Sequence, residues 1–264
     1  MKALVLAAGY ATRLYPLTEN TPKPLLRIAG RPIINYIIDN LKSIKLLDEI
    51  FVVTNDKFYG HFKSWAKDLE QNSDFKKNGL VITVINDGTK TESSRIGAIG
   101  DIEFVIKNQK LKNDLLILGG DNLFTWGLED FINYSIGHKP QVTIGLFDIK
   151  NSAQAAKYGV VAIDNKAEVV DFQEKPNIPN STLVAMCLYY LPAEKLMLIR
   201  QYLTQMKSLD KKDASGNYIK WLYPKESVFA HVFRGHWYDI GDIDSYKDAD
   251  SLFTRFLRIG AKKK

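Results

Sequence analysis

The stretch Lys2–Leu26 reads KALVLAAGYATRLYPLTENTPKPLL and combines a first strand with the loop that follows it. Its first part, Lys2–Ala8, is an uninterrupted apolar run of the kind found in strands buried within parallel sheets. Residues 9–24 show no helical periodicity and contain one glycine, one arginine, three prolines and one lysine. Because open α/β sheets bind ligands at the carboxyl ends of their strands, this irregular segment is predicted to be a binding loop.

The pattern of the first half of the chain extends this prediction. Strand-like apolar runs at 49–54, 80–85, 115–118 and 142–147 alternate with helical periodicity at 33–44, 58–69, 95–110 and 128–136. Such alternation is typical of a doubly wound α/β fold, a mostly parallel, Rossmann-like sheet with helices on both faces.

The pattern changes after residue 149. Residues 158–163 and 168–172 flank a polar tetrapeptide and predict a hairpin. A strand is expected at 183–191, a helix at 194–206, a polar surface loop at 211–217, a strand at 228–233 and a closing helix at 245–257. We therefore expect one domain, 1–264, made of two halves, 1–149 and 150–264, of which the second carries a small inserted β-rich part.

Composition narrows the class of protein. The net charge is +6 and the pI about 9.1, but basic residues stand together only in short runs, such as 211–212 and 262–264. Such dispersed basicity favours a small anionic substrate, and we predict no nucleic-acid partner. Cys187 is the single cysteine, which excludes an internal disulfide and favours a reducing compartment. No segment approaches the length of a membrane span, so we predict a cytoplasmic protein with no membrane partner. Homo-oligomers are left open.

The binding loop carries groups suited to phosphate. Gly9 allows close backbone approach, Arg13 offers a planar fork of donors, and Lys23 adds a point charge between Pro22 and Pro24. A polyphosphate cradle is one interpretation, and a surface loop with solvated cations is the other. The glycine spacings of the P-loop and of the dinucleotide-binding fold are both absent from the sequence.

Two carboxylates could hold the cation that polyphosphate chemistry needs. Asp121 follows an apolar strand within Gly-Gly-Asp-Asn, and Asp239 lies in Trp-Tyr-Asp-Ile-Gly-Asp. Oxygen ligands suit Mg²⁺, but each aspartate could equally cap a turn or helix, a role for which Asp242 is well placed. The short motif Glu174-Lys175-Pro is likewise either a phosphate-binding element or an exposed charge pair.

A resemblance to a known family separates these alternatives. Leu6–Leu14 (LAAGYATRL) and Pro22–Leu26 (PKPLL) resemble the opening motif of the sugar-phosphate nucleotidyltransferases, including glucose-1-phosphate thymidylyltransferase-like enzymes. The resemblance extends more weakly to about Tyr246. It implies an enzyme that joins a nucleoside triphosphate and a sugar 1-phosphate into an NDP-sugar, releases pyrophosphate and uses Mg²⁺. It also implies that 1–149 is the nucleotide-binding half and 150–264 the sugar-phosphate-binding half.

The resemblance also implies residue roles. It assigns catalytic phosphate contacts to Arg13, Lys23 and Lys175; nucleotide contacts to Leu6, Ala8, Gly9, Gly88 and Thr89; acceptor contacts to Gly159, Glu174 and Lys175; and the metal to Asp121 and Asp239. The mechanism needs no protein nucleophile, because an anionic phosphate oxygen attacks the α-phosphorus and pyrophosphate leaves. Positioning and electrostatic stabilisation then do most of the catalysis.

The chain departs from the family pattern at three places, of which the segment 86–100 and Cys187 leave the substrates open. Ala11 stands where a second glycine is usual, and the segment 86–100 is longer than usual. Lys90 and Arg95 within it are either phosphate contacts or solvated cations. Cys187 either lies against the sugar or is a core cysteine. The alternatives are therefore cytidylyl or uridylyl transfer to a non-sugar phosphate, and a catalytically silent regulatory homologue.

Overall fold

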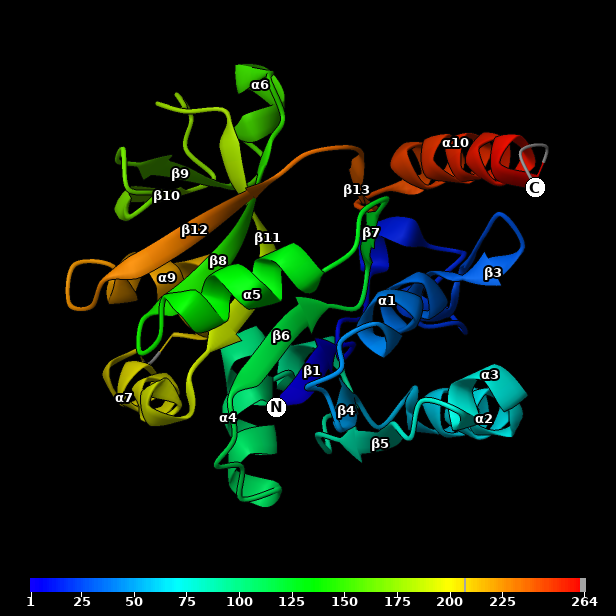
Figure 1. The fold of residues 1–264 in the computed structure, drawn as a ribbon. Helices are drawn as coiled ribbons and strands as arrows, with labels where there is room; N and C mark the ends of the chain where they lie inside the picture. The colour runs from blue at the N-terminus through cyan, green and yellow to red at the C-terminus, as the bar shows by residue number, and fades with distance from the viewer. Residues whose placement is uncertain (207, 262–264) are drawn as a thin grey trace.

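The protein is described here from a computed structural model that covers residues 1–206 and 208–261. Its centre is a nine-stranded mixed sheet with helices on both faces (Figure 1). The strands are β1 (Lys2–Leu6), β4 (Glu49–Thr54), β5 (Val81–Asn86), β6 (Leu115–Gly119), β8 (Val142–Asp148), β9 (Gly159–Ile163), β10 (Val169–Glu174), β11 (Leu183–Leu191) and β12 (Val228–Phe233). The predicted α/β class with a mostly parallel centre is confirmed.

The order of the strands explains where a site can form. Strands run β10-β9-β11-β6-β1-β4-β5, and β8 joins β11 to β12. β6, β1, β4 and β5 are parallel, whereas β11 is antiparallel to β6. The chain moves outward from β1 through β4 to β5 and then returns to the other side of β1 as β6. The topological switch point therefore lies between β1 and β6, where ligands bind in open α/β sheets.

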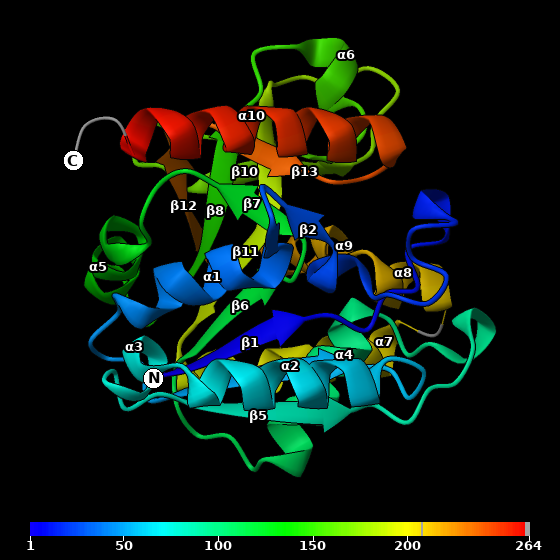
Figure 2. The same cartoon turned by 90° about the vertical axis from the view of Figure 1, so that its right-hand side faces the viewer.

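Ten helices complete the described part of the chain. They are α1 (Ile33–Lys42), α2 (Tyr59–Gln71), α3 (Ser73–Lys76), α4 (Ala98–Asn108), α5 (Glu129–Gly137), α6 (Ser152–Ala155), α7 (Met197–Gln205), α8 (Leu209–Asp213), α9 (Ser215–Leu222) and α10 (Ile243–Ala261). Residues of α1, α2 and α5 share one buried cluster with the sheet, and residues of α4, α7 and α9 share the other. Figure 2 shows α1 and α2 in front of the strands and α4 behind them.

Short strands and 3-10 turns lie within the loops that connect the main elements. Strands β2 (Arg27–Ile28) and β3 (Arg31–Pro32) form one small pair, and β7 (Asn122–Phe124) and β13 (Trp237–Asp239) form another. The 3-10 turns are η1 (Thr12–Leu14), η2 (Lys23–Leu25), η3 (Glu92–Ser94) and η4 (Ala193–Lys195).

One predicted element is wrong. The segment 211–217 was expected to be a surface loop, but the structure places the end of α8 and the start of α9 there. The apolar positions that drive α9 lie after its polar beginning, since Tyr218, Ile219 and Leu222 are its large buried side chains. Gly216 lies in the first turn of α9, so the glycine does not end the helix.

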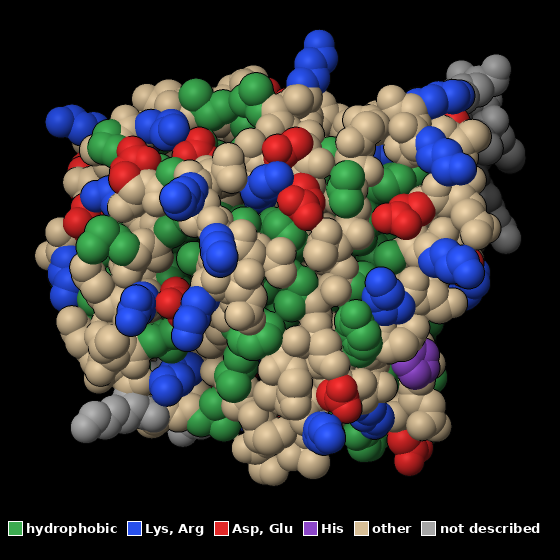
Figure 3. Space-filling view, turned by 90° about the horizontal axis from the view of Figure 1, so that it is seen from below, with side chains coloured by type: hydrophobic (Ala, Val, Ile, Leu, Met, Phe, Trp, Pro, Cys, Tyr) green, Lys and Arg blue, Asp and Glu red, His purple; other side chains and the backbone are tan. Residues whose placement is uncertain are grey.

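The surface keeps the mixed charge seen in the composition. In the view from below Figure 1, Lys and Arg side chains lie among acidic and apolar ones (Figure 3). None of the helices in the described ranges has the length and apolar character that a membrane span requires.

Candidate active site

The first loop is ordered by contacts that its own residues make. Ala11 takes a left-handed conformation with φ 49° and ψ 43°. Its carbonyl oxygen accepts hydrogen bonds from the Thr18 hydroxyl at 2.7 Å and the Leu14 amide at 3.0 Å. Left-handed backbone costs a non-glycine residue about 1–2 kcal/mol, so these bonds offset a local strain. The loop therefore has a defined conformation, in which Ala11 adopts a backbone geometry that a glycine would adopt more easily.

Helix α10 packs against the region of the first loop. Leu14, Leu26 and Ile28 of the loop region share a buried cluster with Phe253 of α10. The Tyr246 hydroxyl donates to the Arg27 carbonyl at 2.6 Å, which ties the helix to β2. Asp242 caps α10 as predicted, because its Oδ1 accepts from the Ser245 amide at 2.8 Å. Helix α10 thus packs against the loop that follows β1.

Asp121 is placed beside this loop by the two glycines before it. The Gly120 amide donates to the Leu6 carbonyl at 2.8 Å, and a Cβ at Gly120 would lie 2.8 Å from that same oxygen. Only glycine allows β6 to close so tightly onto the end of β1. As a result Asp121 lies at the switch point, where its Oδ2 accepts from Lys23 Nζ at 2.6 Å. The lysine side chain is only 12% exposed.

Asp239 reaches the same place through the small sheet. β13 pairs antiparallel with β7 in a register that sets Asp239 opposite Asn122. Asp121 directly precedes β7, so the two carboxylates lie at neighbouring positions although they are far apart in sequence. Both line a cavity of about 450 Å³.

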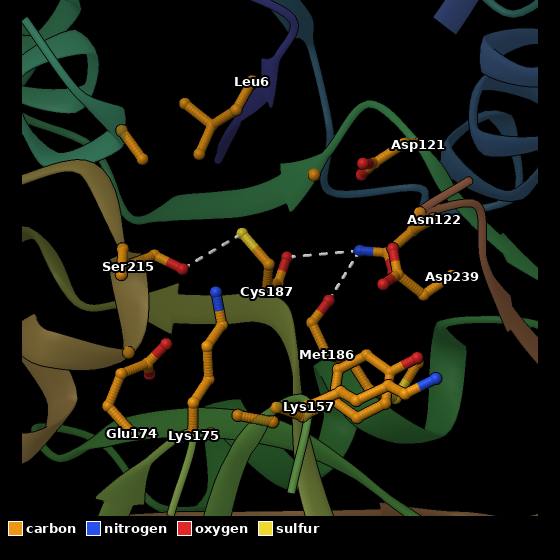
Figure 4. Close-up of a pocket in the computed structure, with 18 of the residues that line it drawn as sticks. Leu6, Asp121, Asn122, Lys157, Glu174, Lys175, Met186, Cys187, Ser215 and Asp239 are labelled. Atoms are coloured by element: carbon orange, nitrogen blue, oxygen red, sulfur yellow. Dashed lines mark hydrogen bonds between the residues drawn. The ribbon is translucent and has the colours of Figure 1, made fainter. Parts of the chain in front are cut away.

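The opposite side of the cavity comes from the second half of the chain. Glu174 ends β10, and Lys175 follows with φ 47° and its amide bonded to the Tyr158 carbonyl. Figure 4 shows both side chains pointing into the cavity, with Asp121 and Asp239 across from them. The buried ring of Phe172 lies beneath, where Cβ atoms on Gly159 or Gly216 would come within 2.5 and 2.8 Å of its Cζ.

The structure brings most of the predicted site residues together. The cavity is lined by Leu6, Arg13, Asp121, Gly159, Glu174, Lys175 and Asp239, and Lys23 touches it through Asp121. Four other residues predicted for the site are described by the structure but do not line the cavity: Ala8, Gly9, Gly88 and Thr89. Gly88 and Thr89 form a turn in which the Thr89 amide donates to Asp87 Oδ1 at 2.7 Å. From the same segment, the cavity-lining residue is instead Ala98, next to Gly97.

Other lining residues were missed by the sequence analysis. Their side chains or backbone include Ala98, Asn122, Lys157, Tyr158, Tyr189, Ser215, Gly216 and Trp237. Asn122, Tyr158 and Trp237 stand inside the quoted motifs, so their position beside Asp121, Gly159 and Asp239 was an available signal. Ser215 and Gly216 had none, because their segment resembles a loop.

The sequence left the roles of three residues open, and the structure places each of them. Arg95 does not line the cavity but pairs with Asp213 at 3.3 Å and donates to the Glu92 carbonyl. Lys90 is exposed. Cys187 lines the cavity, with φ 50° at an irregularity in β11, and its Sγ accepts from the Ser215 hydroxyl at 3.5 Å. Cys187 is half-buried, and it packs against the apolar cluster that α4, α7 and α9 share with the sheet.

The carboxylate pair is electrostatically unequal. Enclosure acts to raise the pKa of Asp121, but the charge and hydrogen bond of Lys23 outweigh it and the pKa is lowered. For Asp239, burial and then the nearby Asp121 raise the pKa above its ordinary value, against the opposing charges of Lys23, Arg13 and Lys175. Two carboxylates so close disfavour ionising together unless a cation lies between them.

This arrangement fits a divalent cation. Asp121 and Asp239 offer only oxygen donors, which Mg²⁺ prefers, so these two carboxylates would hold the cation. A bound cation would relieve the repulsion that raises the pKa of Asp239. The structure thus offers a place where a metal and two anionic substrates could meet.

Comparison with known proteins agrees with this geometry. Residues 2–255 match the sequence profile described as nucleotidyl transferase. The bifunctional protein GlmU of Methanocaldococcus jannaschii is 29% identical over 91% of this chain and 51% of its own length. The glucose-1-phosphate adenylyltransferase of Fervidobacterium nodosum is 28% identical over 96% of this chain and 61% of its own length. The chain therefore spans about half to three fifths of these relatives.

Solved structures share the fold. A UDP-glucose pyrophosphorylase complexed with UDP-glucose superposes with a TM-score of 0.80 at 18% identity, covering 96% of this chain and 98% of that one. A Bacillus anthracis protein described as a candidate glucose-1-phosphate thymidylyltransferase, in complex with sucrose, gives 0.76 at 20% identity, covering 96% and 95%. With the profile match over nearly its whole length, this chain belongs to the nucleotidyl transferase family.

Proposed function

We propose that the chain transfers a nucleotidyl group from a nucleoside triphosphate to a sugar 1-phosphate and releases pyrophosphate. The observation that carries the proposal is the meeting of Arg13, Lys175, Asp121 and Asp239 in one cavity at the switch point. They come from four separate parts of the chain. The relatives named GlmU, adenylyltransferase and pyrophosphorylase support the same class of reaction.

In the proposed reaction an oxygen of the sugar phosphate forms a bond to the α-phosphorus. The bond from that phosphorus to the bridging oxygen breaks, and pyrophosphate leaves with the electron pair. Arg13 stabilises the departing charge, Lys23 bridges the α-phosphate and the attacking oxygen, and Lys175 orients the acceptor. A Mg²⁺ ion held by Asp121 and Asp239 would neutralise phosphate charge when bound.

The two ends of the cavity differ in the chemistry that they offer. Leu6 ends the parallel strand β1, and Ala98 begins helix α4 on the same side of the cavity, so we place the nucleotide there. Gly97 and Ala98 then take the role first given to Gly88 and Thr89. Ala8 and Gly9 remain part of the proposal as backbone of the loop. Glu174 offers a carboxylate to sugar hydroxyls beside Gly159, and the rings of Tyr158 and Trp237 lie nearby. This acceptor end favours a sugar over a simple alcohol. We also propose that the reaction uses Mg²⁺. We further propose a cytoplasmic location, which the free thiol of Cys187 supports.

The test is pyrophosphate release from each common nucleoside triphosphate paired with a panel of sugar 1-phosphates in the presence of Mg²⁺. Arg13→Ala should lower turnover at least about 100-fold with the fold retained, the effect of removing one transition-state donor. Arg27→Ala is the matched control, because Arg27 is exposed and, among the described residues, its guanidinium donates a hydrogen bond only to the nearby Gly30 carbonyl. Release with no pair of substrates, or equal turnover in both variants, would contradict the proposal.

A further inference from the structure

Asn122 is the one side chain that bonds directly to both β11 and β13, among the hydrogen bonds of the described residues. It is 5% exposed and begins β7, directly after Asp121. Its amide nitrogen donates to the Met186 carbonyl at 2.6 Å and lies 3.4 Å from the Cys187 carbonyl. Its amide oxygen accepts from the Trp237 indole N–H at 2.9 Å (Figure 4 shows the first two bonds).

These bonds join three strands at the point where the metal carboxylates lie. β13 carries Trp237 and Asp239, and β7 directly follows Asp121. Residues of β11, among them Met186 and Cys187, line the same cavity. β7 and β13 are only three residues long each, so their own ladder is short. An isolated two-stranded pair of this kind is marginal, and the buried amide supplies the connection that the ladder lacks.

We propose that Asn122, through Trp237, is a positioning residue that sets the separation of Asp121 and Asp239 for a divalent cation. The inference rests on the proposed function and adds a residue pair to it. Asn122 and Trp237 act through the carboxylates and not on the reacting phosphorus. Residues that orient metal ligands typically change metal affinity about 10–100-fold when altered.

The chain offers a matched pair of substitutions. Trp237→Phe removes the indole N–H that Asn122 accepts, while a ring remains to pack on Tyr158 and Phe147. Trp126→Phe removes a buried indole N–H that has no hydrogen-bond partner, and Trp126 does not line the site cavity. Trp126 also packs in a group of rings, stacked on Phe124 and Phe233. Both substitutions thus change aromatic packing, but only Trp237→Phe breaks the bond to Asn122.

The experiment titrates Mn²⁺, read by electron paramagnetic resonance, into each protein with and without inorganic tripolyphosphate, a base-independent probe. Trp237→Phe should weaken Mn²⁺ binding about 10-fold, and Trp126→Phe should leave it within about twofold. Asn122→Leu should weaken binding at least as much, and adding Trp237→Phe to it should cause little further loss, because the bond is already gone. Circular dichroism and thermal melting show that each variant is folded.

Three results would overturn the inference. Trp237→Phe could lower the melting temperature while Mn²⁺ affinity stays at the wild-type value, which would make the bond purely structural. The effects of Asn122→Leu and Trp237→Phe on affinity could add fully, which would uncouple the two residues. Wild-type protein could bind no Mn²⁺ under either condition, which would leave no cation site to position. Turnover is measured separately, so loss of the proposed reaction is distinguishable from each of these results.

Discussion

Replacing Gly97 by alanine should disable the nucleotide end of the cavity, whereas the same change at Gly88 should not. Both glycines have positive φ, 80° at Gly97 and 82° at Gly88. A Cβ on Gly97 would lie 2.8 Å from three backbone atoms of Lys212 and Asp213, but a Cβ on Gly88 would meet nothing within 4 Å. Gly97 also has ψ 161°, a combination almost restricted to glycine.

The magnitude follows from these two terms. The backbone conformation of Gly97 costs an alanine about 1–3 kcal/mol, and overpacking against rigid backbone adds about 1–3 kcal/mol. Gly88→Ala carries only a backbone term of about 1–2 kcal/mol. Thermal melting should therefore place Gly97→Ala several degrees below Gly88→Ala, since about 1 kcal/mol corresponds to about 2–4 °C at this size. Because relief of the overlap must shift Ala98, the KM for the triphosphate should rise about 10-fold or more in Gly97→Ala only. Equal melting temperatures and equal KM values in the two variants would refute the reasoning.

Three further predictions use other parts of the structure. Burial, and then the neighbouring Asp87, raise the pKa of Asp101 well above its ordinary value. The protonated carboxyl therefore contributes stability that is fully present below the pKa of Asp101 in the unfolded chain. This contribution is lost as the pH rises through the pKa of Asp101 in the folded protein. Melting curves should therefore show Asp101→Asn more stable than wild type at about pH 8 and nearly equal to it at about pH 4, and the reverse order would contradict the assignment. Burial raises the pKa of the Cys187 thiol to about 12. At about pH 8, iodoacetamide should therefore label Cys187 of the native protein about 1,000-fold more slowly than a free thiol, and unfolding should remove this difference. Rapid labelling of the native protein would show an ionised thiol and contradict the prediction. Gly216→Ala would set a Cβ 2.2 Å from Glu174 Oε2 and 2.8 Å from the Phe172 ring, so the KM for the acceptor should rise about 10-fold with little change for the triphosphate, whereas Gly137→Ala, in open space at the end of α5, should change neither.

Sequence alone could place the parts of the site that follow directly from one strand. The loop with Arg13 and Lys23 and the aspartate after β6 were predicted because each stands at the carboxyl end of an apolar run. Parallel strands bring such ends to one edge of the sheet, so no knowledge of distant contacts was needed. The doubly wound class was predictable for the same reason, from the alternation of the two periodicities.

The missed features depend on contacts between distant segments. The bond from Trp237 to Asn122 joins residues 115 positions apart, and nothing local in either motif specifies it. Gly88 and Gly97 lie in one long segment, and only the packing of Lys212 and Asp213 against Gly97 distinguishes them. The start of α9 is polar on its own, and it becomes a helix because the apolar side chains that follow are buried.

The charges of the cavity also differ from the positive cradle that the motifs suggested. Of the charged residues that line it in the described part of the chain, Asp213 pairs with Arg95 and Asp242 caps α10, so neither is free to act at its centre. What remains is Asp121, Asp239 and Glu174 against Arg13, Lys157, Lys175 and the adjoining Lys23. Four cations against three carboxylates leave little excess positive charge for two substrates that each bring several negative charges. If the proposed reaction is right, much of the attraction that holds both substrates must come from a cation that is not part of the chain, and Asp121 and Asp239 would be the residues that bind it. On this reasoning, removing divalent metal should weaken binding of the triphosphate itself, as read by calorimetry, and unchanged affinity in the presence of a chelator would show that the side chains alone supply the charge.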